Sequence, residues 1–164
     1  MRSRTAMWFE CKIRYDKVME DGLEKKVTEA YAIDALSYSE AEKRIIEEMT
    51  GYISGAFDVD TITKAPYKEI FFDDTDAMAD TYYRAKLAFI TIDEKTEKEK
   101  ESIVNYLVQA GSFEKACENI EKVMNASMID YRVVSVAETK LLDVFEYTKA
   151  SEEPDGKQKA AGDN

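Results

Sequence analysis

The chain has 164 residues, a formal net charge of -11 at pH 7 and no histidine; 45% of its residues are hydrophobic and 35% are charged. The negative charge argues against a protein that coats duplex nucleic acid, because such proteins carry a broad basic surface. The lack of histidine excludes Ser-His-Asp catalysis, Cys-His catalysis and histidine-ligated metal sites.

A β-hairpin is the first expected element. Trp8–Tyr15 alternates between apolar and polar side chains, and this alternation predicts a half-buried strand. The turn sequence Glu20–Gly22 follows, and Val27–Ala35 is expected to return as the second strand.

A helix and two short strands are expected next. Ser37 is predicted to cap the helix and Glu40 to complete a capping box. An apolar stripe then continues to Met49, with acidic residues on the opposite side. Phe57–Thr63 and Tyr67–Phe72 are predicted to be short strands joined by a turn.

The second half of the chain is expected to repeat this order. Its predicted strands are Tyr82–Phe89, Ile103–Ala110, Tyr131–Ala137 and Leu141–Tyr147. Ser112 is predicted to cap the second helix, but Lys115 stands where the first helix has Glu40. Only the simple cap is therefore expected there.

The two halves are also similar residue by residue, at an offset of about 75 residues. Three pairs of segments align: Trp8–Tyr15 with Tyr82–Phe89, Tyr31–Met49 with Tyr106–Met124, and Phe57–Phe71 with Tyr131–Phe145. This predicts a tandem duplication of a β-β-α-β-β unit with a pseudo-twofold relation. The expected class is α+β, with a mostly antiparallel sheet and helices packed on one face.

The expected domain organisation follows the repeat. We predict a flexible N-terminal extension at 1–6, a first repeat unit at 7–72 and an acidic linker at 73–81. A second repeat unit is predicted at 82–147. The tail at 148–164 lacks apolar periodicity and is predicted to be disordered.

No catalytic, metal or cofactor site is expected. Asp73–Asp80 resembles the start of a calcium loop, but Ala79 and Ala85 stand where an EF-hand needs glycine and glutamate. Cys11 and Cys117 belong to no Cys-x-x-Cys pair, so free thiols in a reducing, cytoplasmic compartment are expected. The sequence has no phosphate-binding glycine motif. An enzyme built on carboxylates or tyrosine stays open as an alternative.

Six residues form a candidate ligand-binding face, because the alternation of the two first strands places them opposite the expected core. They are Trp8, Lys12, Arg14, Tyr82, Arg84 and Lys86. Aromatic rings interleaved with cations on a sheet are typical of surfaces that stack nucleotides or single-stranded nucleic acid. The structural alternatives are an amphipathic outer face and a seam between repeats or subunits.

Mimicry of nucleic acid by carboxylates is a further hypothesis. It requires that Glu40, Glu42, Glu47 and Glu48 line up with the Asp73–Asp80 run on one surface. A solvated helix face and a solvated linker explain the same charges.

Four stretches of the sequence are distinctive: WFECKIRY, VTEAYAIDALSYSEAEKRIIEEMTGYISG, AFITIDEKTEKEK and VVSVAETKLLDVFEY. Together they resemble an uncharacterised family, a domain of unknown function found mainly in Bacteroidetes and in their phages and mobile elements. The similarity covers about residues 7–147. The resemblance implies no activity, cofactor or active-site residue, and it favours a small binding or host-interaction role.

We therefore expect a non-catalytic, acidic binding protein of phage or mobile-element type that acts as a protein-interaction module in the cytoplasm. The alternative is a nucleotide or single-stranded nucleic-acid binder that uses the aromatic and basic face. No apolar run approaches the ~20 residues that a membrane helix needs, so no membrane partner is expected. The protein partner and the oligomeric state stay open.

Overall fold

The computed structural model describes residues 1–147, and the predicted tail at 148–164 lies outside the described residues. In chain order the elements are β1 (Arg2–Arg4), β2 (Trp8–Val18), β3 (Glu24–Asp34), α1 (Tyr38–Tyr52), β4 (Phe57–Lys64), β5 (Glu69–Phe72), β6 (Thr81–Ile92), β7 (Glu99–Ala110), α2 (Phe113–Ser127), β8 (Tyr131–Glu138) and β9 (Leu141–Phe145). Every predicted strand and both predicted helices are present. The short strand β1 was not expected from the sequence.

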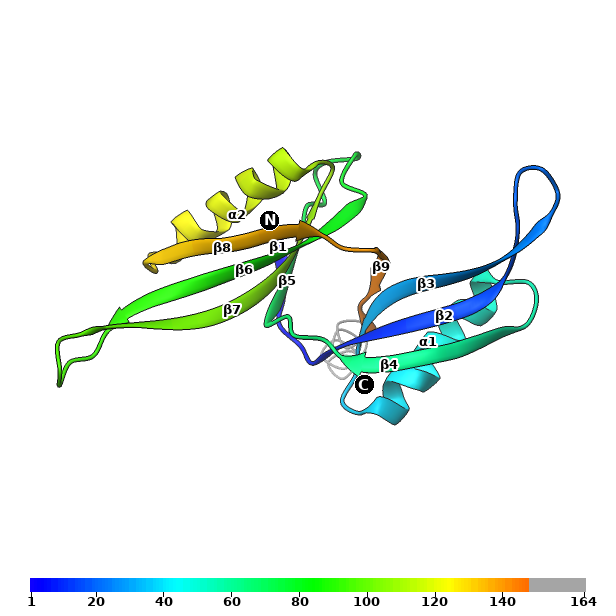
Figure 1. The fold of residues 1–164 in the computed structure, drawn as a ribbon, viewed down its shortest axis with the longest axis horizontal. Helices are drawn as coiled ribbons and strands as arrows, with labels where there is room; N and C mark the ends of the chain where they lie inside the picture. The colour runs from blue at the N-terminus through cyan, green and yellow to red at the C-terminus, as the bar shows by residue number, and fades with distance from the viewer. Residues whose placement is uncertain (148–164) are drawn as a thin grey trace, which may run out of the picture. The chain divides into compact units, whose positions relative to one another are not determined.

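The strands form two sheets (Figure 1). One has the order β1-β5-β7-β6-β8 and the other the order β4-β2-β3-β9. Neighbouring strands are antiparallel except for β5 beside β7 and β9 beside β3, which are parallel. The prediction of an α+β fold with mostly antiparallel strands is confirmed.

The chain divides into two compact units, and neither of them is one continuous piece of sequence. Of the described residues, the unit that we call the α1 unit holds Met7–Ala65 together with 141–147. The α2 unit holds Met1–Ala6 and Pro66–Lys140. Each unit is described separately below.

The predicted repeat boundaries, 7–72 and 82–147, are wrong in the last strand of each half. β5 pairs with β7 and β9 pairs with β3, so each short strand completes the sheet of the other half. The expected hairpin of third and fourth strands is also wrong, since β4 pairs with β2 and β8 with β6. The pattern of a short apolar strand shows which residues are buried but not which longer strand lies beside it.

The N-terminal extension and the acidic linker differ from expectation as well. Residues 1–6, predicted to be flexible, contain β1, which pairs with β5 in antiparallel fashion. Arg2 Nε lies 2.7 Å from Asp74 Oδ2, and the Arg2 guanidinium lies 4.2 Å from the centre of the Phe72 ring. The segment 73–81 lies within the α2 unit, between β5 and β6, and does not link the two units.

Both predicted serine caps are confirmed, but Glu40 bonds to Leu36, one residue before the expected partner Ser37. Ser37 Oγ accepts a hydrogen bond from the Glu40 backbone N–H at 3.1 Å, and Glu40 Oε1 accepts one from the Leu36 N–H at 2.6 Å. Ser112 Oγ accepts from the Lys115 N–H at 3.1 Å, the simple cap expected without a reciprocal glutamate. These bonds satisfy backbone donors that a helix start leaves free, so helix and preceding strand meet at a defined residue.

Each unit has its own apolar core between one face of its sheet and its helix. α1 packs on β2, β3 and β4, and α2 packs on β6, β7 and β8 (Figure 1). Buried members are Phe9, Cys11, Ile13, Ile33 and Ile45 in the α1 unit, and Ala85, Leu87, Val108, Ile120 and Met124 in the α2 unit. The alternation of β2 and β6 therefore predicted the core-facing side correctly.

The two sheets share a β-bulge at corresponding positions. The register between β2 and β4 shifts after Lys12, where Asp60 is the extra residue. The register between β6 and β8 shifts after Lys86, where Val134 is the extra residue. The bulges in β4 and β8 thus lie at matching positions, and residues of the two units can be compared from these positions.

A side chain at the end of each central strand fixes the exchanged short strand. Asp34 ends β3, and its Oδ1 accepts a hydrogen bond from the backbone N–H of Tyr147 at 2.7 Å. Gln109 lies next to the end of β7, and its Oε1 accepts from the backbone N–H of Asp73 at 2.9 Å. β9 in the α1 unit and β5 in the α2 unit are thus anchored in the same way.

Candidate functional site

The predicted aromatic and basic face does not form an open stacking platform. Trp8 is 1% exposed and Tyr82 is 4% exposed, so neither ring can accept a stacked base. Of the four cations in the predicted face, Lys12, Arg14 and Arg84 are exposed, and Lys86 is half-buried. The period-two pattern predicted one covered face, but the first residues of β2 and β6 are buried on both faces.

The six residues are also divided between the two units. Trp8, Lys12 and Arg14 belong to the α1 unit, and Tyr82, Arg84 and Lys86 belong to the α2 unit. Two of the cations have sheet neighbours as partners: Arg14 Nη1 lies 3.2 Å from Asp60 Oδ1, and Arg84 Nε donates to Asn105 Oδ1 at 3.2 Å. These contacts fit the alternative of an amphipathic outer face.

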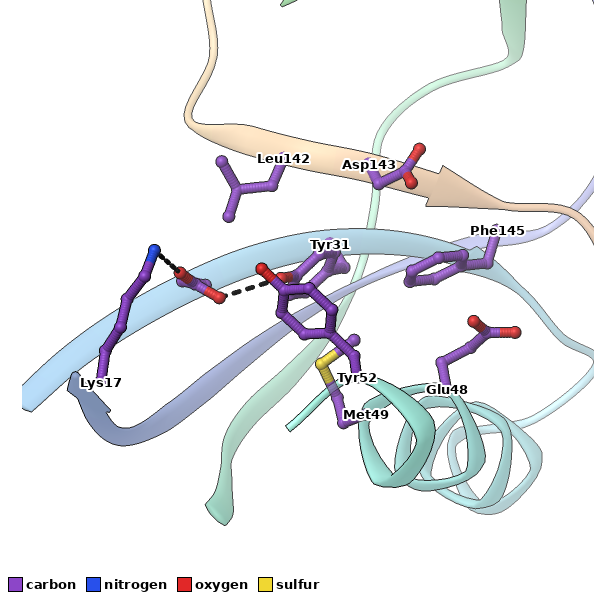
Figure 2. A pocket seen from close by; sticks show the side chains of 9 residues that line it. Lys17, Tyr31, Glu48, Met49, Tyr52, Leu142, Asp143 and Phe145 are labelled. Atoms are coloured by element: carbon purple, nitrogen blue, oxygen red, sulfur yellow. Dashed lines mark hydrogen bonds and ion pairs between the residues drawn. The ribbon is translucent and has the colours of Figure 1, made fainter. Parts of the chain in front are cut away.

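A pocket of about 410 Å³ in the α1 unit is the stronger candidate site (Figure 2). We call it the Glu29 pocket. It is lined by Lys17 of β2, Glu29 and Tyr31 of β3, Glu48, Met49 and Tyr52 of α1, and Leu142, Asp143 and Phe145 of β9. Because its walls come from three strands and a helix, the side chains stand on rigid elements.

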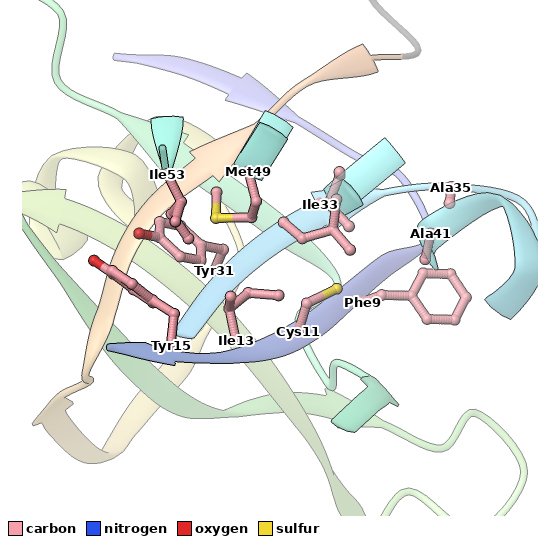
Figure 3. Packing of buried hydrophobic residues seen from close by; sticks show 11 residues of the cluster. Phe9, Cys11, Ile13, Tyr15, Tyr31, Ile33, Ala35, Ala41, Met49 and Ile53 are labelled. Atoms are coloured by element: carbon pink, nitrogen blue, oxygen red, sulfur yellow. The ribbon is translucent and has the colours of Figure 1, made fainter. Parts of the chain in front are cut away.

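Glu29 is the buried polar centre of this pocket. It is 8% exposed, and its Oε1 accepts hydrogen bonds from the Tyr15 hydroxyl at 3.0 Å and the Tyr31 hydroxyl at 2.9 Å. Lys17 Nζ lies 3.5 Å from the other oxygen, Oε2. Figure 3 shows both tyrosine hydroxyls on the same side of the core. These donors offset the cost of removing a carboxylate from water.

Both tyrosines stay protonated at neutral pH. Burial, together with the hydrogen bond to Glu29, raises the pKa of Tyr15 to about 12. The same two causes raise the pKa of Tyr31 further. The two hydroxyls therefore act as hydrogen-bond donors to Glu29.

A second group of acids lies at the β9 side of the pocket. Burial raises the pKa of Asp143, and the negative charge of Glu48 raises it further, against the lowering effect of the Val144 backbone N–H. Glu48 accepts a hydrogen bond from the Tyr147 hydroxyl, whose pKa is raised by burial and by this bond. Figure 2 shows Asp143 and Glu48 on one side of Tyr52, and Lys17 on the other.

Aromatic and apolar groups form the rest of the wall. The rings of Tyr31 and Phe145 stack with centroids 5.5 Å apart and an interplanar angle of 24°. Tyr52 is exposed at the rim, and Leu142 is half exposed. The pocket therefore combines three carboxylates and one ammonium with ring faces.

The corresponding place in the α2 unit holds apolar residues. Glu29 pairs with Ile13 across β3 and β2, and Val104 pairs with Leu87 across β7 and β6. Val104 thus corresponds to Glu29, and it packs on the α2 core. A valine at this position satisfies the fold, so packing alone does not explain a buried glutamate in the α1 unit.

Two more polar residues of the α1 unit have apolar counterparts. The offset that matches the strands places Phe89 at the position of Tyr15 and Val123 at the position of Glu48. Phe89 and Val123 both pack on the α2 core. The polar set is therefore a property of one unit, added to a framework that the other unit builds from apolar side chains.

The sequence comparison assigns the family. A family described as a domain of unknown function, DUF4494, matches residues 7–147. The chain belongs to the DUF4494 family. The span confirms the resemblance seen in the sequence over the same residues. No curated protein and no solved structure matches this DUF4494 chain.

One signal in the sequence could have indicated the Glu29 pocket of this DUF4494 chain. Val27, Glu29, Tyr31 and Ile33 lie on the same side of β3, and a charged residue stands in the middle of this inward row.

Within residues 1–147 no three His, Cys, Asp or Glu side chains gather as a metal site, and no helix is long and apolar enough to cross a membrane.

Proposed function

We propose that the chain is a small, acidic, non-catalytic binding protein, and that a protein partner docks at the Glu29 pocket. The observation that carries this proposal is the buried Glu29 carboxylate, held by Tyr15, Tyr31 and Lys17 at an open pocket. The α2 unit has apolar residues at the matching place, so the same framework can be built without a polar pocket. A role as an interaction module of phage or mobile-element type agrees with these features.

The size of the pocket supports recognition of a side chain or a short peptide segment. Its volume of about 410 Å³ lies within the range of ligand sites. The protonated state of Tyr15 and Tyr31 supports binding over chemistry, since a tyrosine with a raised pKa is a poor base at neutral pH.

A tandem duplication explains how one unit came to differ from the other. The matching caps at Ser37 and Ser112 and the matching bulges at Asp60 and Val134 support it. After duplication, one copy keeps the framework while the other accumulates polar side chains. The pseudo-twofold relation stays a prediction. The two free cysteines support a reducing compartment such as the cytoplasm.

The test uses a variant that gives the α1 unit the side chains of the α2 unit. This apolar-pocket variant is Tyr15→Phe/Glu29→Val/Glu48→Val. A displayed random peptide library is selected on the wild-type chain, and the enriched peptides are measured against the variant. We expect peptides that bind the wild type and lose at least about tenfold in affinity on the variant.

The control is Glu42→Val/Glu121→Val, which also removes two carboxylates but at exposed helix positions outside the pocket. This control should bind the same peptides as the wild type does. Thermal unfolding of all three proteins checks that the fold is retained. Selection of no peptide, or equal binding by the folded apolar-pocket variant, would refute the proposed site.

A further inference from the structure

We infer that the Glu29 pocket receives a basic side chain, arginine or lysine, from the partner, and that Lys17 occupies its Glu29 end until the partner arrives. This inference rests on the proposed function and adds the chemistry of the bound group. It also assigns Lys17 a role as an internal competitor of the ligand.

The charge of the pocket favours a cation. Three carboxylates, those of Glu29, Glu48 and Asp143, face one ammonium, that of Lys17. Within the described part of the chain, Lys17 lies against Glu29, and neither Glu48 nor Asp143 has an ion-pair partner. Burial is the main cause of the raised pKa of Asp143, and the negative charge of Glu48 adds a smaller repulsive contribution. A cation bound in the pocket would offset this negative charge.

The rings favour an organic cation with an apolar stem over a metal ion. Tyr31, Phe145 and Tyr52 present aromatic surface, and Leu142 and Met49 present aliphatic surface. A guanidinium or ammonium is attracted to ring faces, and the methylene groups of arginine or lysine pack on apolar walls. The described carboxylates do not converge as a metal site, so a hard divalent cation fits less well.

Lys17 shows that the pocket accepts an ammonium and also that this ammonium is loosely held. Its Nζ lies 3.5 Å from Glu29 Oε2, a long separation, and its side chain is 44% exposed while that of Glu29 is 9% exposed. Such a pair contributes little to stability. A partner cation can therefore displace Lys17 and form an ion pair with the buried Glu29 carboxylate.

The experiment compares two probe peptides that differ in charge alone. One is acetyl-Gly-Ser-Arg-Ser-Gly-amide, and the other has citrulline in place of arginine. Each is titrated up to millimolar concentration into the full chain labelled with nitrogen-15, and amide shifts around β3, β9 and α1 are followed. We expect the arginine peptide to bind at least about tenfold more tightly than the citrulline peptide.

Two substitutions give opposite expected effects. Lys17→Met should tighten binding of the arginine peptide about threefold, because the internal competitor is gone. Asp143→Asn should weaken it by about tenfold. The matched control is Lys26→Met, since Lys26 Nζ also lies 3.5 Å from a carboxylate, Asp16 Oδ1, but outside the pocket. That control should leave the affinity unchanged.

Several results would overturn the inference. They are an absence of pocket shifts with the arginine peptide, equal binding of the citrulline peptide, and weaker binding of the arginine peptide by Lys17→Met, which would mean that Lys17 does not compete with the ligand. If the library yields peptides without arginine or lysine that still require the pocket, the proposed function stands and the basic ligand is wrong. If it yields none, the proposed function itself fails.

Discussion

At the scale of single residues, Tyr15 and Phe89 occupy matching places in β2 and β6, yet only the tyrosine meets a carboxylate. Burying the Glu29 carboxylate costs free energy that its hydrogen bonds offset, whereas the corresponding Val104 needs no such compensation. Polar side chains at positions where an apolar core would suffice are expected at functional sites. The contrast between these residues therefore supports the proposal that the pocket has a role beyond packing.

Tyr15→Phe is expected to destabilise the chain by about 1–2 kcal/mol, because the buried Glu29 loses one of its donors. In a Glu29→Val background the same change should cost almost nothing, since the hydroxyl then has no carboxylate to bind. Denaturant unfolding of the four members of this cycle gives the coupling energy.

Tyr38→Phe is the control, because Tyr38 is 55% exposed. It should leave the free energy of unfolding nearly unchanged. Equal losses from Tyr15→Phe in both backgrounds would show that the Tyr15–Glu29 hydrogen bond contributes no stability.

The sequence predicted candidate residues only where the signal was local. Lys12, Arg14 and Arg84 were expected to face outward, and they are exposed. Trp8 and Tyr82 were expected to face outward as well, and they are buried, because alternation along a strand does not show what covers its outer face. Glu29 was missed because a single inward charge has no motif.

At the scale of elements, each exchanged strand is held by a polar anchor and by a donor from the helix. Arg44 Nη1 donates to the backbone oxygen of Asp34 at 2.7 Å in the α1 unit. Asn119 Nδ2 donates to the backbone oxygen of Gln109 at 3.1 Å in the α2 unit. The helix thus fixes the end of the central strand, and that end fixes the short strand beside it.

Gln109→Ala is expected to destabilise the α2 unit by about 1–3 kcal/mol. The Asp73 backbone N–H would lose its acceptor, and the Ala79 oxygen would lose the Gln109 Nε2 donor at 3.0 Å. Asn105→Ala is the control on the same strand, because Asn105 accepts from Arg84 at an exposed position. Denaturant unfolding measures both losses in stability. A larger loss for Asn105→Ala than for Gln109→Ala would show that Gln109 does not anchor β5.

Helices and long strands followed from the sequence, but strand partners did not. Ser37 and Ser112 act within one turn of the chain, so their caps could be predicted from neighbours in sequence. The partner of β5 depends on residues far along the chain, and its short apolar sequence fits beside β3 or β7 equally well by pattern.

At the scale of the whole molecule, each unit is completed by a strand from the other half of the sequence. β9 supplies the buried Leu141 and Val144 to the α1 unit, and β5 supplies Ile70 and Phe71 to the α2 unit. The pairing of β3 with β9 joins residues more than a hundred positions apart, as in Tyr31 with Asp143. Pairing at such a distance is entropically costly and slows folding.

Truncation of the chain after Lys140 should therefore destabilise the N-terminal strands β2 and β3 rather than β6 and β7, which are nearer in sequence. The truncated chain lacks β9, whose buried Leu141 and Val144 each contribute about 1.5–3 kcal/mol. Amide hydrogen exchange should lose protection in β2 and β3 of the α1 unit. β6 and β7 of the α2 unit should keep theirs.

A chain that ends at Tyr147 is the control, because it keeps β9 and the Tyr147 N–H that binds Asp34. It should exchange like the full-length chain over both sheets. Loss of protection in β6 and β7 on removal of β9 would contradict the exchanged arrangement and would restore the sequential division into halves.

The bulges at Asp60 and Val134 have a consequence for behaviour at high concentration. β4 and β8 are each one of the two edge strands of their sheets, and an exposed edge of this kind can template the addition of another chain. The extra residue in each strand interrupts the even spacing of donors and acceptors along that edge. The bulges therefore make these two edges poorer templates for strand addition by another chain.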